Sequence, residues 1–291
     1  MTTVLDDNVH CFSVDGNSDE LDVPIKAVFA CPQYVEENRL CSINSINWAR
    51  ILVQISHFIY CYLQLADTVG CPVSIVCPTG ACGNIASGYV AHQMGLPVQL
   101  VAAVTPNDVV HRTFSTGDYS LNKDVLQTWA TAMDIQVAHS DRTAWQCQCN
   151  YFDSSALQVP YNVERILLMA AGLDTARVAA VMKEFERESR SVIPPDLLAV
   201  IQTVVVNSRT VTCEEMIASM VRCREENNSP GYTICPHTAV GVTYHYTNPA
   251  TVPQVVLATA SPYKFPEAVK AAGLTIQESP EIAGLFSLPT R

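Results

Sequence analysis

The chain has 291 residues, of which 48% are hydrophobic and 15% are charged, and its formal net charge is −11. It is too apolar for a disordered chain and has enough apolar side chains for a sizeable core. The acidic balance argues against a nucleic-acid partner, because neutralising phosphates needs clustered Lys and Arg side chains. The first twenty residues are rich in Asp and contain no long apolar run, so a secretory signal is not expected.

Membrane spans and disulfides are not expected either. The most apolar long segment, 48–65, contains Arg50 and His57, and its large side chains recur at helical spacing. The 12 cysteines are scattered through apolar segments, where a free cysteine behaves as a small hydrophobe. We therefore expect reduced thiols in a cytoplasmic or organellar protein, with secretion of a short form left open as an alternative. Nothing in the sequence predicts an oligomeric state.

The first elements in chain order predict a βαβ unit after the 48–65 helix. Residues 73–77 form an apolar run typical of a buried strand, and residues 85–94 have the spacing of a helix. Gly95 suits the position just after a helix end. Residues 98–104 are a second predicted strand, and two strands joined by one such helix pair in parallel.

The rest of the chain predicts helices at 162–172, 175–189, 195–205, 214–226 and 266–272, and a buried strand at 255–259. The predicted fold class is therefore α/β, an open, mostly parallel sheet with helices on both faces. Residues 138–159 have no clean period and interrupt this pattern, so we expect an inserted loop there. Cys147, Cys149 and His139 within it match no common zinc spacing, and no metal site is predicted.

The segment from Pro78 to Asn84, Pro-Thr-Gly-Ala-Cys-Gly-Asn, lies between a predicted strand and a predicted helix. The free backbone N–H groups and the dipole of a helix N-terminus favour anions. Gly80 and Gly83 allow the backbone to approach a phosphate closely. The segment matches neither the P-loop nor the dinucleotide pattern, so a single phosphate group fits better. The alternative is a glycine-rich turn without a ligand.

Three other segments place polar residues beside apolar runs. Asn44, Ser45, Asn47 and Arg50 lie at the start of the long helix, where Asn44 or Ser45 could instead be an N-cap. His237 lies in the segment 235–241, which reads as a short turn in which the histidine could be structural. Thr259 ends a predicted strand, and open α/β sheets bind their ligands at strand ends.

The blocks NSINWARILVQ, PTGACGNIASGYVAHQMGLP, NDVVHR, AMDIQV, YNVER, PHTAVGV and TASPYKFPEAV occur in this order. Together with MTTVLDDNVH and VDGNSDELD near the N-terminus, they resemble the threonine synthase family over nearly the whole chain. The resemblance implies a tryptophan synthase β-like fold, that of the type II pyridoxal-phosphate enzymes, here incomplete. Residues 1–40 would be a remnant of the small domain, and 41–291 the large cofactor-binding domain with the insertion at 138–159.

The resemblance also implies the cofactor site. Pyridoxal 5′-phosphate would be held through its phosphate by the loop Gly80, Ala81, Cys82, Gly83 and Asn84, and Thr259 would face its pyridine nitrogen. The loop departs from the usual Gly-Asn-Phe-Gly-Asp of the synthases. This departure places threonine synthesis itself in doubt and favours the synthase-like branch of the family.

The chemistry implied by the resemblance is the loss of phosphate from O-phosphohomoserine or phosphothreonine, which yields 2-oxobutyrate and ammonia. Substrate-binding candidates are Asn44, Ser45, Asn47, Arg50, Arg112, Arg165 and His237, and guanidinium groups pair well with phosphate. The family's catalytic lysine, which forms a Schiff base with the cofactor, belongs to sequence before Met1. We therefore expect no catalytic residue in this chain.

Two alternatives to this enzyme remain. One is a non-catalytic shortened form that acts as a binding or signalling protein. The other is a thiol enzyme that uses Cys82, whose position at a helix N-terminus would lower its pKa.

Overall fold

The computed structural model describes residues 4–12, 24–25, 27–42, 47–122, 126, 128–130, 133, 160–226, 232–276 and 280–289. The predicted inserted loop at 138–159 lies outside the described residues, as do the substrate-binding candidates Asn44 and Ser45.

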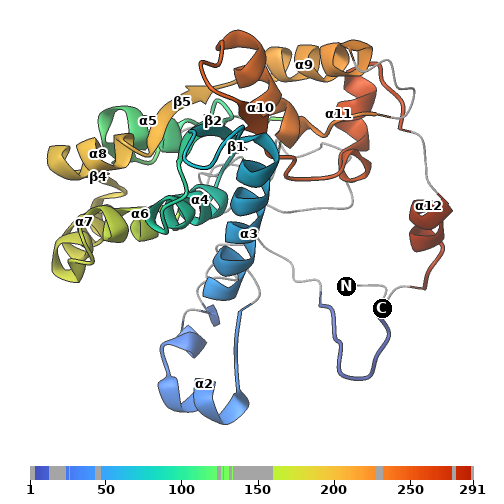
Figure 1. The fold of residues 1–291 in the computed structure, drawn as a ribbon. Helices are drawn as coiled ribbons and strands as arrows, with labels where there is room; N and C mark the ends of the chain where they lie inside the picture. The colour runs from blue at the N-terminus through green and yellow to red at the C-terminus, as the bar shows by residue number, and fades with distance from the viewer. Residues whose placement is uncertain are drawn as a thin grey trace.

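The centre of the protein is a parallel sheet with the strand order β5-β2-β1-β6 (Figure 1). Its strands are β1 (Val73–Pro78), β2 (Val98–Val104), β5 (Val205–Thr210) and β6 (Gln254–Val256). Val76 of β1 pairs with Val101 on one side and with Val256 on the other. All six residues of β1 are buried, as the apolar run of a central parallel strand requires. A separate antiparallel pair consists of β3 (Asp118–Ser120) and β4 (Arg190–Val192).

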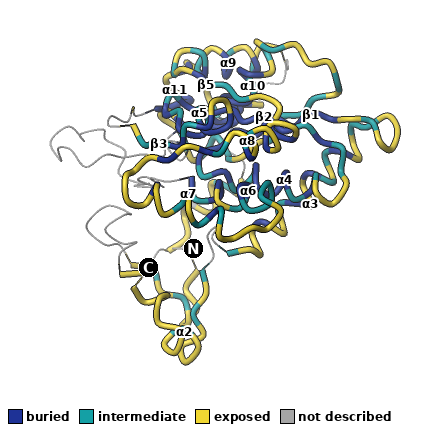
Figure 2. Tube along the Cα trace, turned by 90° about the vertical axis from the view of Figure 1, so that its left-hand side faces the viewer, coloured by how far each residue is buried: buried dark blue, intermediate teal, exposed yellow. Residues whose placement is uncertain are grey.

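Helices cover both faces of the sheet, so the predicted fold class is confirmed. Ile75 and Cys77 of β1 belong to one core cluster and Val76 to another, because alternate strand residues face opposite sides. The first cluster is formed with α3 (Trp48–Leu65), α4 (Gly83–Gln93), α5 (Val109–Thr116), α6 (Val163–Ala170), α7 (Thr175–Glu188) and α8 (Pro195–Gln202). The second is formed with α9 (Cys213–Glu226), α10 (Pro236–Thr247) and α11 (Pro266–Ala271). Figure 2 shows the buried residues concentrated between these layers.

The order of the strands reverses between β1 and β6. From β1 the chain passes through α4 to β2 and then to β5, always outward on the first face. It returns through α9 and α10 on the second face to β6, on the other side of β1. Ligands of open α/β sheets bind at such a switch point, outside the carboxyl ends of the strands.

Two predicted elements were wrong. Helix α8 ends at Gln202, and the following residues 205–210 are strand β5. The sequence hides this strand because β5 is at one end of the described sheet and is only partly buried, so it lacks a continuous apolar run. The segment 235–241 is not a short turn but the start of α10, a helix rich in residues of low helix propensity that is stabilised by burial on the sheet.

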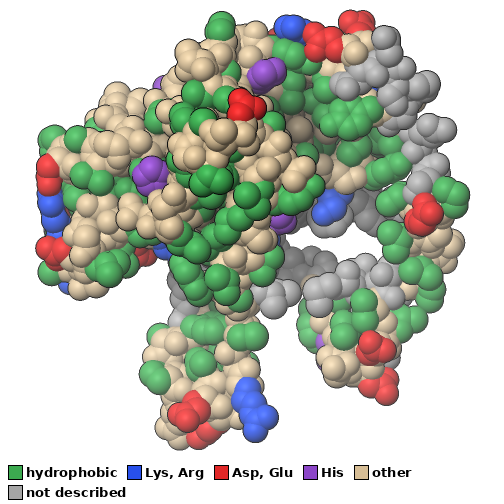
Figure 3. Space-filling view, in the orientation of Figure 1, with side chains coloured by type: hydrophobic (Ala, Val, Ile, Leu, Met, Phe, Trp, Pro, Cys, Tyr) green, Lys and Arg blue, Asp and Glu red, His purple; other side chains and the backbone are tan. Residues whose placement is uncertain are grey.

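The N-terminal part of the chain packs little. None of the described residues between 4 and 42 is buried, and α2 (Pro32–Asn38) stands away from the main body, as does α12 (Pro280–Phe286) (Figure 1). Helix α3 buries one side and exposes Leu52, Val53, Tyr60 and Leu63. Figure 3 shows hydrophobic side chains gathered over this part of the surface. No helix among the described residues has the length and apolarity needed to cross a membrane.

Candidate functional site at the carboxyl edge of the sheet

The loop after β1 forms a cluster of unpaired backbone donors. Cys82 is the N-cap of α4 and adopts the left-handed conformation, with φ 61° and ψ 15°. A left-handed residue followed by a helical one turns successive N–H groups to a common side, which makes an anion-binding concavity. For the N–H groups of residues 80–84, no acceptor is found among the described residues. The dipole of α4 adds positive potential at the same point.

Side-chain hydrogen bonds hold this loop in place. Asn84 donates from Nδ2 to the carbonyl of Pro78 at 2.8 Å and accepts from Thr79 Oγ1 at 2.7 Å. Asn162, just before α6, donates from Nδ2 to the carbonyl of Ala81 at 2.8 Å. The two bonds to the backbone use carbonyl groups and the third joins two side chains, so the loop is fixed while its N–H groups stay available.

Gly80 is tightly packed. A Cβ at this position would lie 3.0 Å from the Cα of Met133, so the backbone of Met133 would have to shift by a few tenths of an ångström to admit it. The sequence explains the glycine at position 80 by the close approach of a phosphate. Packing against the backbone of Met133 is a second reason for it.

Cys82 is not an activated thiol. Its side chain is fully buried, and burial raises the pKa of the thiol far above its usual range, although a hydrogen bond with Thr79 lowers it somewhat. The thiol-enzyme alternative was therefore wrong. Desolvation disfavours the thiolate more than the helix N-terminus favours it.

Thr259 lies three residues after β6, the strand next to β1, so the prediction of a strand that continues to residue 259 was wrong. Val256 pairs with Val76, and the N–H of Leu257 donates to the carbonyl of Val76 at 3.0 Å. This pairing ends two residues before Thr259, on the strand β1 that leads into Thr79 and the loop. The side chain of Thr259 is exposed, and its hydroxyl has no partner in the part of the chain that the structure describes.

His237 reaches the same edge from the other face of the sheet. It lies in the first turn of α10, is 3% exposed, and packs against the ring of Phe265 at 4.4 Å between centroids. Neither ring nitrogen has a hydrogen-bond partner within the described ranges of the chain. Burial, and secondarily the charge of Lys264, lowers the pKa of His237 to about 4, so the ring is neutral near pH 7.

The predicted arginines occupy different surroundings. Arg165 donates from Nη1 to Oδ1 of Asn162 at 2.7 Å. Asn162 in turn donates to the carbonyl of Ala81, so it links Arg165 to the loop. Arg112 pairs with Asp108 at 2.9 Å and Asp118 at 2.5 Å, an arrangement that favours a structural role between α5 and β3. These two ion pairs account for Arg112 without a substrate.

The polar residues predicted at the start of α3 are only partly described. The N-cap of α3 is Asn47, not Asn44 or Ser45, and its Oδ1 accepts from the N–H of Ala49 at 2.9 Å. Its Nδ2 donates to the carbonyl of Ser42. Arg50 is exposed in the first turn of the same helix. The capping interpretation therefore accounts for Asn47.

Sequence reasoning did not find Thr79, Asn162 or Tyr119. Thr79 and Asn162 shape the loop through the hydrogen bonds above. The Tyr119 hydroxyl is buried and finds no hydrogen-bond partner in the described structure. Burial, and then the proximity of Cys82 and Glu164, raises its pKa. The sequence offers one local signal, an asparagine at the start of a predicted helix. In the structure the side chain of Asn162 does not cap α6.

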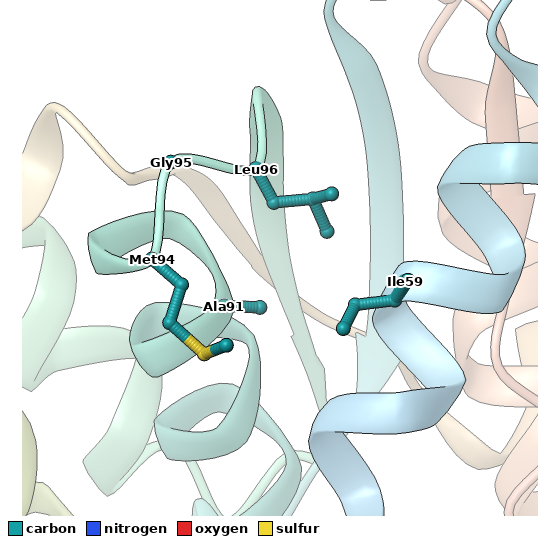
Figure 4. Close-up of a pocket in the computed structure, with 5 residues that line it drawn as sticks. All are labelled: Ile59, Ala91, Met94, Gly95 and Leu96. Carbon is teal, nitrogen blue, oxygen red and sulfur yellow. The ribbon is translucent and has the colours of Figure 1, made fainter.

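A depression elsewhere does not share this chemistry. It has a volume of about 220 Å³ and is lined by Ile59, Ala91, Met94, Gly95 and Leu96 (Figure 4). Ile59 of α3 faces Ala91 and Leu96 across it. It lies at the C-terminal end of α4, away from the loop, and its apolar lining offers no group for catalysis.

The unpaired donors at the switch point fit a phosphorylated ligand, and the fold around them is that of the type II pyridoxal-phosphate enzymes. The structure of the PLP-bound threonine synthase from Brucella melitensis superposes with a TM-score of 0.82 at 32% identity, covering 100% of this chain and 57% of that one.

Residues 238–291 match the family described as Threonine synthase, C-terminal. Threonine synthase-like 2 of Homo sapiens is 45% identical over 300 residues, and that of Rattus norvegicus is 44% identical over 300 residues. Each match covers 100% of this chain and 56% of the relative. The chain is similar to threonine synthase-like 2 proteins and threonine synthases along its whole length, and it spans about half the length of the curated relatives it matches.

Proposed function

We propose that this chain binds pyridoxal 5′-phosphate at the carboxyl edge of its sheet and takes part in phosphate elimination from a phosphorylated amino acid. The observation that carries the proposal is the set of unpaired N–H groups at residues 80–84, at the N-terminus of α4 and at the point where the strand order reverses. The similarity to a PLP-bound threonine synthase supports the identity of the phosphorylated ligand.

Each residue of the proposed site has one task. Residues 80–84 would bind the cofactor phosphate through their N–H groups, and Asn162 and Asn84 would hold the loop in the binding conformation. The unpartnered hydroxyl of Thr259 would bind the pyridine nitrogen. A neutral hydroxyl leaves that nitrogen largely unprotonated. When bound, the cofactor supplies an electron sink for the substrate α carbon.

The proposed substrates are O-phosphohomoserine and phosphothreonine. With one water, either compound yields 2-oxobutyrate, ammonia and inorganic phosphate, so atoms balance without an oxidant or reductant. Arg165 is the preferred arginine for the substrate phosphate, because Asn162 links it to the phosphate loop. A guanidinium and a phosphate form strong charge-assisted hydrogen bonds.

The described lysines do not supply an obvious covalent partner for the cofactor. Lys183 lies on α7 and Lys270 on α11, both away from the loop. Lys264, in the short helix η2 (Pro262–Lys264), is exposed five residues after Thr259. This placement supports the second candidate function, in which the chain by itself binds the cofactor or its phosphate without catalysis.

Borohydride reduction separates the two candidates. The chain is incubated with pyridoxal phosphate, reduced, digested and mapped by peptide mass, while phosphate and 2-oxobutyrate release are measured in parallel. We expect saturable cofactor binding, no stoichiometric label on a single lysine and no turnover. Stoichiometric labelling of Lys264, with turnover abolished by Lys264→Ala, would show that this chain is an enzyme on its own.

The buried cysteines Cys77, Cys82 and Cys235 are not in disulfides, which supports our further proposal of a reducing, cytoplasmic compartment.

A further inference from the structure

The first turn of α10 carries buried polar groups for which the described residues offer no partner. His237 is 3% exposed, and neither of its ring nitrogens has a hydrogen-bond partner among those residues. In the described part of the chain, its backbone N–H has no acceptor either, whereas the next N–H, of Thr238, donates to Sγ of Cys235. Buried polar groups are almost always paired in folded proteins, so this arrangement points to a ligand.

The surroundings of His237 favour an anion. The N-terminus of α10, a helix of 12 residues, contributes the positive end of its dipole. The positive charge of Lys264 acts electrostatically on the His237 ring. The ring of Phe265, the next residue, packs against the His237 ring. Because the imidazole is neutral, it donates one N–H to an acceptor and adds no charge of its own.

This turn lies beside the candidate cofactor site. One turn further along α10, a Cβ on Gly241 would lie 2.9 Å from Cγ of Pro78 and 2.6 Å from Cγ1 of Val256. His237 is therefore close to the ends of β1 and β6, across the sheet from α4. The N-termini of α4 and α10 approach the switch point from opposite faces.

We propose that the first turn of α10 is a second anion-binding point, at which His237 binds an oxygen of the substrate's carboxylate or phosphate and Lys264 adds attraction. The inference rests on the proposed function, because the loop at 80–84 would already be occupied by the cofactor phosphate. It names the substrate class as an amino acid with an anionic group directed at α10.

The test uses unreactive probes and calorimetric titration of the full chain. 4′-Deoxypyridoxine phosphate, which lacks the aldehyde, reports on the loop. 2-Amino-5-phosphonopentanoate, an analogue of O-phosphohomoserine, and norvaline, which lacks the phosphonate, report on the second point. The variants are His237→Phe, which keeps an aromatic ring against Phe265, and His237→Gln, which keeps a side-chain N–H donor. His245→Gln, at the other end of α10, is the matched control.

We expect His237→Phe to weaken phosphonate binding about tenfold and His237→Gln to restore much of it, as loss and return of a charge-assisted hydrogen bond requires. The melting temperature of His237→Phe should not fall, since an apolar ring replaces an unpaired polar one. Lys264→Met should weaken binding about threefold, and Lys270→Met, on the neighbouring helix, should have no effect.

The two sources of the anion give different patterns. If His237→Phe weakens the phosphonate but not norvaline, the oxygen belongs to the phosphate, and if both weaken equally, it belongs to the carboxylate. Equal binding by wild type and His237→Phe of both probes would overturn the inference and leave His237 a packing residue. Failure of deoxypyridoxine phosphate to bind wild type would instead overturn the proposed function, and the phosphonate titration would still decide the role of His237.

Discussion

The side-chain amide of Asn162 donates a hydrogen bond of 2.8 Å to the backbone carbonyl of Ala81, which lies 81 residues earlier in the chain. Asn162 is completely buried, and its Oδ1 accepts from Arg165 in turn. The bond connects the start of α6 to the loop before α4. The loop conformation therefore depends on a residue outside the βαβ unit that contains it.

Replacing Asn162 by Ala should loosen the loop. The half-buried carbonyl of Ala81 would keep only the longer bond from the backbone N–H of residue 162, at 3.4 Å, and losing one such side-chain hydrogen bond costs about 0.5–1.5 kcal/mol. We expect the free energy of unfolding to fall by that amount in denaturant titration and the affinity for deoxypyridoxine phosphate to fall several-fold. The control is Asn38→Ala on the exposed helix α2. Equal affinity in both variants would show that Asn162 does not shape the site.

Substituting Gly241 by Ala should push α10 away from the sheet. The new Cβ would meet Val256 at 2.6 Å and Pro78 at 2.9 Å, and overpacking of this kind costs about 1–3 kcal/mol. Gly284→Ala is the matched control, since its Cβ would meet nothing within 4 Å. Both are compared by chemical denaturation. A Gly241→Ala protein as stable as wild type would contradict the close approach of α10.

Arg112 and Arg165 should behave oppositely when each is replaced by Met. Burial opposes ionisation of Asp108, yet hydrogen bonds from Arg112 and Asn122 hold the pKa of this carboxyl below its usual range. Arg112→Met should therefore cost stability, by about 1–2 kcal/mol for a partly buried pair, without weakening phosphonate binding. Arg165→Met should weaken phosphonate binding. A phosphonate affinity that falls only in Arg112→Met would reverse the assignment.

His237 should make stability depend on pH. The unfolded chain takes up a proton with the ordinary pKa of 6.5, whereas the folded chain does so only near 4. Between these values the unfolded state binds more protons, so stability is complete above pH 6.5 and falls as the pH is lowered towards 4. The loss should reach at most about 3 kcal/mol.

The measurement is the unfolding free energy of wild type and His237→Phe at several pH values from 7 to 4. The variant lacks this titration, so the difference between the two curves should grow in its favour as the pH falls. Parallel curves would mean that His237 is not buried in a neutral form.

The sequence predicted those strands and helices whose buried side chains form an unbroken apolar run or a regular helical stripe. Strand β1 is apolar throughout because it is buried on both faces, and α3 has an apolar stripe because one side of the helix is buried. Helix α3 and strand β2 have the predicted bounds. Strand β5 and helix α10 were missed because their identity depends on where they pack. Gly241 lowers the helix propensity of α10, and only the approach to Pro78 and Val256 explains it.

Part of the candidate site could likewise be predicted from the sequence, and part depends on packing. The loop at 80–84 could be predicted because a strand, a glycine-rich turn and a helix follow one another in the sequence. The supports from Asn162 and Met133 could not, since they come from distant parts of the chain. His237 was found as a residue, but its burial without a partner is a property of packing alone.

The central claim is that the N–H groups of the loop bind a phosphate. The most direct measurement is the amide spectrum of the chain labelled with ¹⁵N in glycine and titrated with deoxypyridoxine phosphate. The account predicts saturable shifts of the Gly80 and Gly83 signals, as expected for donors that take up an anion. Gly95, beyond the C-terminal end of α4, and Gly117, at the end of α5, should not shift. Saturable binding that leaves Gly80 and Gly83 unmoved, or no binding at all, would contradict it.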